Sequence, residues 1–385
     1  IAGDGVEVTN DAFNVVNNPD IDIVVELIGG TGIAKELVLK AIESGKHVVT
    51  ANKKLLAEYG NEIFAAAQQK GVTVAFEAAV AGGIPIIKSL REGLTANRIE
   101  WIAGIINGTS NFILTEMREK GAAFADVLAE AQRLGYAEAD PTFDIEGHDA
   151  AHKLTIMSAI AFGIPVQFSK AYLEGISRLT AEDISYAEEF GYRIKLLGIT
   201  KRKPGGIELR VHPTLIPEQR LIANVNGVMN AVLAKGDAVG QTMYYGAGAG
   251  AEPTASAVVA DLVDVTRTLT ADPHHRVPHL AFQPNQMSDL PILPIEEIET
   301  CYYLRLDAQD KKGVLADVTR ILADADISID AMMQKEPQQG EERVDVIILT
   351  HLAVEKNVNA AIAKIEALPT INGKVTRIRL ETLDK

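Results

Sequence analysis

An alternation of short β-branched runs with stretches of helical periodicity constrains the fold of this chain most. Apolar runs at 22–28, 47–50 and 72–76 predict strands, and the segments 33–44 and 54–69 between them predict helices. Strands separated by helices of this length indicate βαβ units in a parallel sheet. We therefore expect an α/β fold with a Rossmann-type sheet, whose ligands bind beyond the carboxyl ends of the strands.

Three segments follow the predicted strands: Gly29-Gly30, Ala51-Asn52-Lys53 and Glu77–Gly83. An ammonium at Lys53 is placed to face a nicotinamide or a substrate carbonyl, although spacing alone favours a solvated surface lysine. Glu77 and the small residues after it offer one carboxylate and several backbone carbonyls, which suit a hard cation. A tight strand-to-helix turn ending near Pro85 explains the same residues without a cation.

The rhythm changes after residue 84, and the pattern predicts a second, α+β part. Strand-like runs at 99–106 and 207–211 mix with helical stretches at 122–134, 148–162 and 181–198. A helix at about 254–270 follows the glycine-rich segment Gly246–Gly250, which either approaches a cofactor or forms a structural turn. Five prolines within residues 273–294 predict a linker.

The last part of the chain predicts a separate unit. Its strands and helices follow the order βαββαβ, the ferredoxin-like arrangement. The turn from Asp310 through Gly313 and Val314 to Leu315 resembles the ligand loop of ACT domains, which bind small amino acids. The expected boundaries are 1–76 for a Rossmann-type part completed by the helix at 254–270, 77–253 for the α+β part, 271–298 for the linker and 299–385 for the C-terminal unit.

The segment Tyr136–Lys153 concentrates charged side chains in a loop and the helix start that follows it. Five carboxylates and one lysine lie within it: Glu138, Asp140, Asp144, Glu146, Asp149 and Lys153. Asp149 and Lys153 are four residues apart and share a helix face. Like charges this dense are costly unless they are solvated or share a cationic partner. The pattern is typical of a site that binds a zwitterionic substrate or moves a proton, and a weak surface pair is the alternative.

Other features of the sequence argue against a zinc site, nucleic-acid binding and a membrane span. His148 and His152 have zinc-motif spacing without a third ligand nearby, and His274, His275 and His279 are expected to be solvated loop residues. A net charge of −15 argues against nucleic-acid binding. No apolar run reaches the length of a membrane span, and a single cysteine, Cys301, fits a reducing cytoplasmic setting.

Over nearly its whole length the chain resembles homoserine dehydrogenase in the form that carries a C-terminal ACT domain. The matching segments, in chain order, are Glu26–Gly30, Val49–Lys53, Glu77–Pro85, Gly104–Asn111, Tyr136–Lys153 and Gly246–Gly250. The resemblance implies NADPH- or NADH-dependent interconversion of L-aspartate 4-semialdehyde and L-homoserine in threonine, methionine and isoleucine biosynthesis. It also implies that residues 1–76 are a partial NAD(P)-binding domain, that 77–253 are the catalytic and dimerisation domain and that 299–385 are an ACT regulatory domain. A homodimer or homotetramer and inhibition by threonine at the ACT domain are implied as well.

The resemblance also implies roles for individual residues. Lys153 would be the acid/base, Asp149 would hold the polar end of the substrate and set the proton, and Lys53 would lie at the nicotinamide and share the proton role. The remaining substrate contacts would come from Glu138, Asp144, Gly108 and Thr109. The remaining cofactor contacts would come from Gly29, Gly30, Gly135, Glu138 and Gly250. A sodium or potassium ion would be held by Glu77 and the carbonyls of Val80, Gly82 and Ile84.

The opening of the chain departs from the family pattern. Homoserine dehydrogenases begin with a strand, a G-x-G-x-x-G loop and a helix, and these residues contain none of them. We expect a polypeptide that begins before Ile1; without such a segment, cofactor binding would be severely weakened. Two alternatives remain: an amino-acid sensor without catalysis, and a dehydrogenase acting on another semialdehyde or amino acid.

Overall fold

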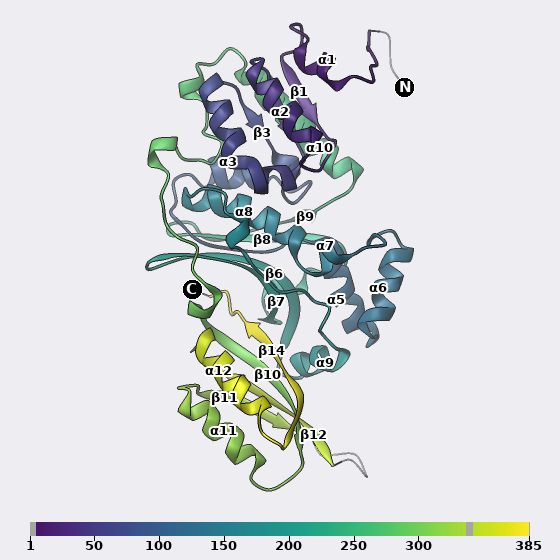
Figure 1. Cartoon of the computed structure of the whole chain (residues 1–385), viewed down its shortest axis with the longest axis vertical. Helices are drawn as coiled ribbons and strands as arrows, with labels where there is room; N and C mark the ends of the chain where they lie inside the picture. The colour runs from purple at the N-terminus through teal and green to yellow at the C-terminus, as the bar shows by residue number, and fades with distance from the viewer. Residues whose placement is uncertain (1–4, 336–341, 385) are drawn as a thin grey trace.

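The computed structural model describes residues 5–335 and 342–384, which form three parts stacked along the long axis of the molecule (Figure 1). The N-terminal part lies at one end and the C-terminal part at the other. The middle part contains long strands and the helix α8 (His148–Phe162). None of the helices within these ranges is long and apolar enough to cross a bilayer.

The N-terminal part contains a parallel sheet of order β1-β2-β3, which confirms the predicted α/β architecture. Its strands are β1 (Ile23–Glu26), β2 (His47–Thr50) and β3 (Val74–Ala75). Its helices are α1 (Ala12–Asn17), α2 (Ile33–Glu43), α3 (Lys53–Lys70) and α10 (Ala251–Thr268). Helix α3 begins where the Asn52 side chain accepts a hydrogen bond from Leu55 N, and ends where Gly71 adopts a left-handed conformation.

Helix α10 belongs to this sheet although about 200 residues separate it from β2. Ala257, Val258 and Val265 on α10 share a buried cluster with Val49 and Ala75 on the sheet. The helix begins directly after Gly250, whose φ of +120° suits glycine. The helix therefore starts three residues before the bound of about 254 expected from the sequence.

A second, larger sheet joins the middle part to the C-terminal part. Its strand order is β11-β12-β10-β14-β7-β6-β4-β8-β9. The first four of these belong to the C-terminal part: β11 (Ile329–Gln334), β12 (Arg343–Thr350), β10 (Glu299–Gln309) and β14 (Ile371–Leu380). The strands of the middle part are β4 (Ile99–Ile105), β5 (Tyr172–Leu173), β6 (Tyr192–Lys203), β7 (Gly206–Pro217), β8 (Met229–Gly236) and β9 (Gly240–Ala247). Parallel pairing of Arg379 with Thr214 and of Leu380 with Leu215 connects β14 to β7. The two parts are therefore continuous through backbone hydrogen bonding.

The C-terminal part has the predicted βαββαβ order with one additional short strand. Its elements are β10 (Glu299–Gln309), α11 (Val314–Asp324), β11 (Ile329–Gln334), β12 (Arg343–Thr350), β13 (Ala353–Val354), α12 (Glu355–Glu366) and β14 (Ile371–Leu380). Tyr302, Leu304, Val318 and Val358 belong to a separate buried cluster in this part. The ferredoxin-like arrangement expected from the sequence is confirmed.

In the middle part, the helix predicted at residues 181–198 is a shorter helix followed by a strand. Helix α9 (Ala181–Glu189) starts with a capping box formed by Thr180 and Asp183, but it ends before Gly191, whose φ is +79°. From Tyr192 the chain continues as β6, which is buried on both faces over much of its length. A strand buried on both faces lacks polar alternation, so its apolar run was read as helix. The β8–β9 hairpin was not predicted either.

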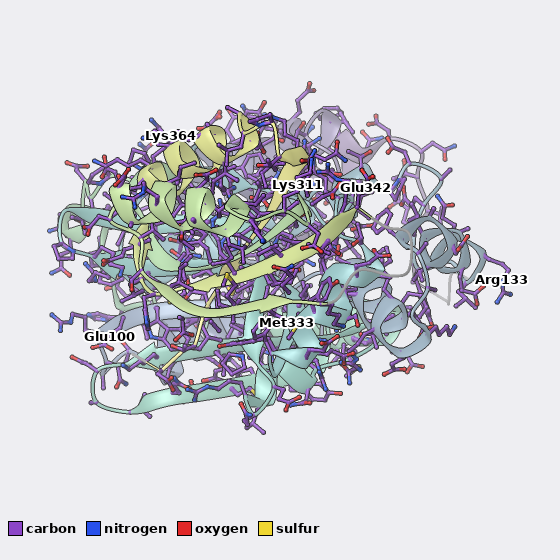
Figure 2. All side chains as sticks on the ribbon, turned by 90° about the horizontal axis from the view of Figure 1, so that it is seen from below. Glu100, Arg133, Lys311, Met333, Glu342 and Lys364 are labelled. Carbon is purple, nitrogen blue, oxygen red and sulfur yellow. The ribbon has the colours of Figure 1, made fainter. Side chains whose placement is uncertain are left out.

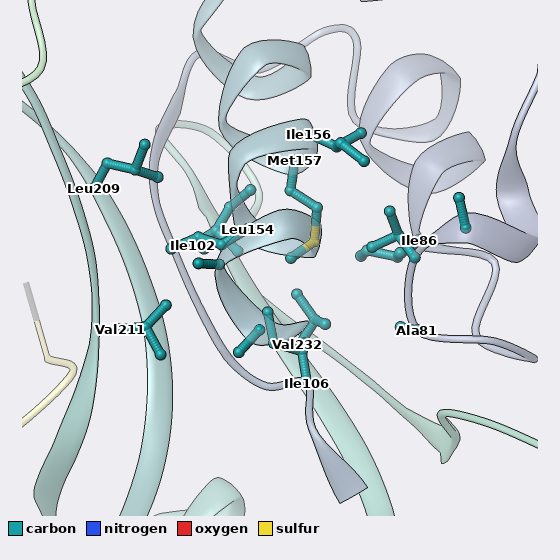
Figure 3. Close-up of a cluster of buried hydrophobic side chains, with 14 of the residues drawn as sticks. Ala81, Ile86, Ile102, Ile106, Leu154, Ile156, Met157, Leu209, Val211 and Val232 are labelled. Carbon is teal, nitrogen blue, oxygen red and sulfur yellow. The ribbon is translucent and has the colours of Figure 1, made fainter. Parts of the chain in front are cut away.

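Helix α8 is the centre of the main hydrophobic core. Fourteen of its fifteen residues are buried, all except His148. Figure 3 shows Leu154 and Met157 between Leu209 and Val211 on one side and Ile86 on the other. The remaining helices of this part are α4 (Ile86–Lys88), α5 (Gly108–Lys120), α6 (Phe124–Arg133) and α7 (Thr142–Ile145). A helix held on all sides gives its polar side chains fixed positions.

The proline-rich segment 273–294 packs against the N-terminal part. His279 Nε2 accepts a hydrogen bond from Val74 N at 3.0 Å, and its ring stacks on Phe64 with centroids 5.4 Å apart. The expectation that His279 is solvated was therefore wrong, because its ring satisfies a strand N–H that lacks a neighbouring strand. His274 and His275 are exposed, as expected.

Candidate active site

Asp149 and Lys153 occupy one face of the first turns of α8. Gly147, with φ of +85°, turns the loop into the helix, and Lys153 Nζ donates a hydrogen bond to Asp149 Oδ2 at 2.7 Å. Their side chains are only 5% and 9% exposed, respectively. The pair predicted from the four-residue spacing is therefore present, and it is buried.

Lys153 has a second oxygen partner and a perturbed pKa. Its Nζ donates a hydrogen bond at 2.7 Å to the backbone oxygen of Ile106, the residue directly after β4. Burial lowers the pKa of Lys153, and the charge of Asp149 opposes this shift. An ammonium has three N–H donors, and only two are engaged with residues that the structure describes. The third N–H is therefore free to donate to a ligand oxygen.

Lys53 reaches the same carboxylate from the N-terminal part. It is the first residue of α3, and its Nζ lies 3.0 Å from Asp149 Oδ1 with 33% of its side chain exposed. Asp149 therefore bridges two ammonium groups. Burial would raise the pKa of Asp149, but the charges of Lys153 and Lys53 outweigh burial and hold that pKa well below its usual value. Asp149 stays ionised and fixes the positions of both lysines.

Asn107 is a site residue that the sequence analysis did not assign. Its Nδ2 donates to Asp144 Oδ1 and to Asp149 Oδ2, both at 2.8 Å, while its Oδ1 caps α5 by accepting from Ser110 N. Burial raises the pKa of Asp144. The available signal was an amide residue at the end of a predicted strand, directly before Gly108.

The loop between α6 and α7 is tied to α5 near these residues. Thr109 Oγ1 donates to Tyr136 O at 2.6 Å. A Cβ on Gly108 would lie 2.7 Å from Val228 O, so glycine is required there for packing. Gly135 and Glu138 are exposed, and within the described part of the chain the Glu138 carboxylate makes neither an ion pair nor a side-chain hydrogen bond. The structure thus places both in the loop that leads to α7, the helix of Asp144, without a direct contact to the lysines.

The carboxyl edge of the N-terminal sheet has the features of a nucleotide site. Gly29 and Gly30 adopt φ of +81° and +71°, and Asn52 Nδ2 donates to Gly30 O at 2.8 Å, next to Lys53. Leu27 and Ile28 beside them are 60% and 58% exposed. Exposed apolar side chains next to an open glycine turn fit the ring systems of a nicotinamide dinucleotide. Gly250 adjoins the start of α10, which packs on the same sheet.

Glu77 acts as a cap for the helical segment that begins at Ile86. Its two carboxylate oxygens accept hydrogen bonds from Ile87 N at 2.8 Å and Lys88 N at 2.9 Å. Burial raises the pKa of Glu77 to about 7. The turn proposed as the alternative to a cation is therefore present. A carboxylate oxygen that accepts one N–H retains a lone pair, so a cation shared with the carbonyls of Val80, Gly82 and Ile84 stays a prediction.

Two groups of candidate residues remain, the histidines of α8 and the turn of the C-terminal part. His152 packs against Phe168 with ring centroids 4.2 Å apart, and burial lowers its pKa to about 4. The Asp310–Leu315 turn lies in the C-terminal part, where Asp310 N donates to Glu342 O at 3.0 Å and Gly313 has φ of +98°. Figure 2 shows Lys311 of this turn near Glu342 at that end of the molecule.

Comparisons with known proteins agree along the whole chain. A family model described as "Homoserine dehydrogenase, NAD binding domain" matches residues 4–77, one described as "Homoserine dehydrogenase" matches residues 85–263, and one described as "ACT domain" matches residues 302–370. A homoserine dehydrogenase of Pseudomonas aeruginosa is 67% identical over 377 residues, which are 98% of this chain and 87% of the relative.

Solved structures give the same result. The crystal structure of a homoserine dehydrogenase from Thiobacillus denitrificans is 76% identical, with a TM-score of 0.94 over 98% of this chain and 86% of that one. A hyperthermophilic archaeal homoserine dehydrogenase in complex with NADPH is 29% identical, with a TM-score of 0.60 over 69% of this chain and 78% of that one. The similarity therefore covers sequence and fold together.

Proposed function

We propose, from the premise that this chain belongs to the homoserine dehydrogenase family, that Lys53, Asp149 and Lys153 are the proton-handling centre of its reaction. The chain is an NAD(P)-dependent oxidoreductase, and its reaction interconverts L-homoserine and L-aspartate 4-semialdehyde. The observation that carries the proposal is the single carboxylate of Asp149 between two ammonium groups, at 2.7 Å and 3.0 Å.

Lys153 supplies the proton in the direction of reduction. As hydride arrives at the aldehyde carbon, negative charge develops on the carbonyl oxygen, and the free N–H of Lys153 neutralises and protonates it. In the direction of oxidation, neutral Lys153 takes the hydroxyl proton. The lowered pKa of this buried lysine makes its neutral form accessible nearer to neutral pH.

Asp149 and Lys53 position Lys153 and complete the charge balance. Ionised Asp149 holds Lys153 Nζ together with Ile106 O, so the ammonium keeps one orientation. Lys53 is the more exposed lysine and comes from the cofactor-binding part, so it lies where a nicotinamide would meet the substrate. The positive charge of Lys53 also lowers the pKa of Lys153.

Glu138 in the α6–α7 loop and Asp144 on α7 bind the amino group of the substrate. Among the described residues the Glu138 carboxylate has no partner, and Asp144 is fixed by Asn107 through one oxygen. Gly108 and Thr109 at the start of α5 bring backbone N–H groups of a helix N-terminus toward the same region, which suits the substrate carboxylate.

A bound NADP or NAD supplies the hydride donor or acceptor. Gly29, Gly30, Lys53, Gly135, Glu138 and Gly250 would hold the cofactor. The exposed Leu27 and Ile28 would exclude water from its ring system. A sodium or potassium ion at Glu77, with carbonyls of Val80, Gly82 and Ile84, would fix the turn that packs against Gly248.

The remaining proposals concern regulation and setting. The enzyme acts in the biosynthesis of threonine, methionine and isoleucine in the cytoplasm, and works as a homodimer or homotetramer. Threonine binds the ACT domain at the Asp310–Leu315 turn and inhibits. The support is the ACT match together with the left-handed Gly313 at the start of α11, which leaves backbone N–H groups open.

Oxidation of L-homoserine by the full polypeptide, followed by the absorbance of reduced NADP or NAD, tests the proposed function. We expect activity with L-homoserine and little with D-homoserine or L-serine. Glu138 and Asp144 fix the amino group of the substrate, and Lys153 fixes the reacting oxygen, so both the chirality and the length of the substrate matter. A preference for another amino alcohol would replace homoserine as the substrate.

A further inference from the structure

A cavity of about 610 Å³ lies between the middle part of the molecule and the C-terminal part. One wall comes from residues 172–179 and Glu146, and the other comes from α12 and β14. The volume is within the usual range for small-molecule sites. None of Lys53, Asp149 and Lys153 lines it, and neither does the Asp310–Leu315 turn. It is therefore separate from the two sites already discussed.

The walls of this cavity are held by ion pairs and a strand pairing. Arg379 contacts Glu174 at 2.8 Å and Glu355 at 2.5 Å, and Arg377 contacts Glu174 at 3.3 Å. Next to them, β14 pairs with β7. Because these charges satisfy one another across the boundary of the two parts, the cavity is formed before any ligand arrives.

Two charged side chains of the lining are left over. Glu146 is half-buried and Arg178 is exposed, and among the described residues neither makes an ion pair or a side-chain hydrogen bond. They carry opposite charges on the same wall of the cavity. Leu179, Ile362 and Ile378 supply an apolar surface beside them. A partly buried carboxylate without a partner is costly, so a bound cation would stabilise it.

We propose that this cavity binds a small α-amino acid with an apolar side chain. The ligand ammonium pairs with Glu146, the ligand carboxylate pairs with Arg178, and the side chain packs against the aliphatic residues. A planar guanidinium recognises a carboxylate by two parallel hydrogen bonds. One free carboxylate and one free guanidinium match a zwitterion and do not match a dicarboxylate or a nucleotide.

Occupancy of this cavity is coupled to the catalytic loop through Glu146. Glu146 lies between Asp144 and Asp149 in the chain, at the junction of α7 and α8. The cavity wall is bound to that junction, since Ile176 N donates to Ile145 O at 2.8 Å and a Cβ on Gly175 would lie only 2.2 Å from Glu146 Oε2. A ligand that draws Glu146 toward itself shifts the segment that orients both aspartates. This regulatory part of the inference rests on the proposed function.

Calorimetric titration of the full chain with L-valine, L-isoleucine and L-methionine, one at a time, tests the site. We expect at least one of them to bind once per chain, and we expect Glu146→Gln and Arg178→Gln each to weaken it at least tenfold. Asp310→Asn, in the ACT turn, is the matched control and should change the affinity less than twofold. Absence of binding by all three, or binding that both cavity variants retain, overturns the proposal.

The coupling is read from homoserine oxidation with and without the amino acid that binds. We expect the bound amino acid to change kcat or KM at least twofold in the wild type and not in Arg178→Gln. Binding at the cavity without any change in rate overturns the coupling and leaves the binding site. Cavity binding by a chain that oxidises no homoserine counts against the proposed function alone, so the two failures are distinguishable.

Discussion

Lys53 Nζ lies 3.0 Å from Asp149 Oδ1, and this contact joins the helix after the second strand of the cofactor sheet to the buried helix that carries Lys153. Ninety-six residues separate the two side chains in the chain. The contact places an ammonium from the nucleotide-binding part beside the carboxylate of the catalytic part. The site therefore exists only when the two parts are packed together.

Replacing Lys53 by alanine should lower catalytic efficiency without unfolding the protein. The side chain is partly exposed, so its loss removes a charge near the reacting oxygen and leaves no buried cavity. We expect kcat/KM for homoserine to fall by about tenfold to a hundredfold, which is about 1.4–2.7 kcal/mol. Lys54→Ala is the control, since Lys54 is the exposed neighbour on α3. Equal kinetics in the two variants would remove Lys53 from the site.

Replacing Asp149 by asparagine should move the pH dependence of homoserine oxidation. Neutral Lys153 is needed in this direction, so the rate rises as pH rises through the Lys153 pKa. The Asp149 charge raises that pKa, and its removal lowers it. The acidic limb of kcat against pH should therefore shift to lower pH, together with a loss in kcat.

Asp140→Asn provides the control for this shift, because Asp140 is an exposed carboxylate in the loop between α6 and α7. Its limb should coincide with that of the wild type. A limb that stays in place in Asp149→Asn would mean that Asp149 acts only in holding the substrate.

His279 should contribute a measurable pH dependence to stability. Burial lowers its pKa from 6.5 to about 4, so between these values the unfolded chain binds a proton that the folded chain does not. Its contribution is complete above pH 6.5 and is lost as pH falls toward 4. We expect His279→Gln to reduce the slope of unfolding free energy against pH by about 1.4 kcal/mol per unit. The exposed His275→Gln should leave the slope unchanged, and equal slopes in both variants would contradict the assignment.

Glu77 should make the activity depend on small monovalent cations. A cation requires the ionised carboxylate, and burial raises the pKa of Glu77 to about 7. The concentration of sodium or potassium needed for half-maximal activity should therefore rise as pH falls below 7. The measurement replaces sodium by tetramethylammonium at constant ionic strength, and Glu77→Gln should abolish the response. Full activity of the wild type in tetramethylammonium would exclude the cation.

Local pattern predicted the elements whose signals are strong and independent of distant residues. The strand at 47–50 and the helix at 148–162 have the bounds expected, because a β-branched run and a pair of flanking glycines define their ends. The helix expected at 181–198 failed beyond Glu189, because burial of β6 on both faces is set by neighbours distant in the sequence. Pairing of β14 with β7 likewise depends on tertiary packing, so the sequence carried no signal for it.

The site divides in the same way. The Asp149–Lys153 pair follows from the helical spacing, so its contact could be predicted. The bridge that Asn107 makes between Asp144 and Asp149 spans 37 and 42 residues, and periodicity cannot detect such contacts. His279 was misread for the same reason, since its partner Val74 is 205 residues away.

The most direct test of the account is the rate of L-homoserine oxidation by Lys153→Ala. The control is Lys195→Met, which removes another buried lysine, one whose pKa burial lowers to about 7 and whose Nζ donates hydrogen bonds to Val225 O and to the side-chain oxygens of Asn111 and Asn226. We expect kcat to fall by about 10²–10⁴-fold in Lys153→Ala, the range for loss of an acid/base group. Lys195→Met should lose stability and keep kcat within about fivefold, the scale of a packing defect distant from the chemistry. A Lys153→Ala enzyme that retains kcat within tenfold of the wild type would contradict the role of Lys153.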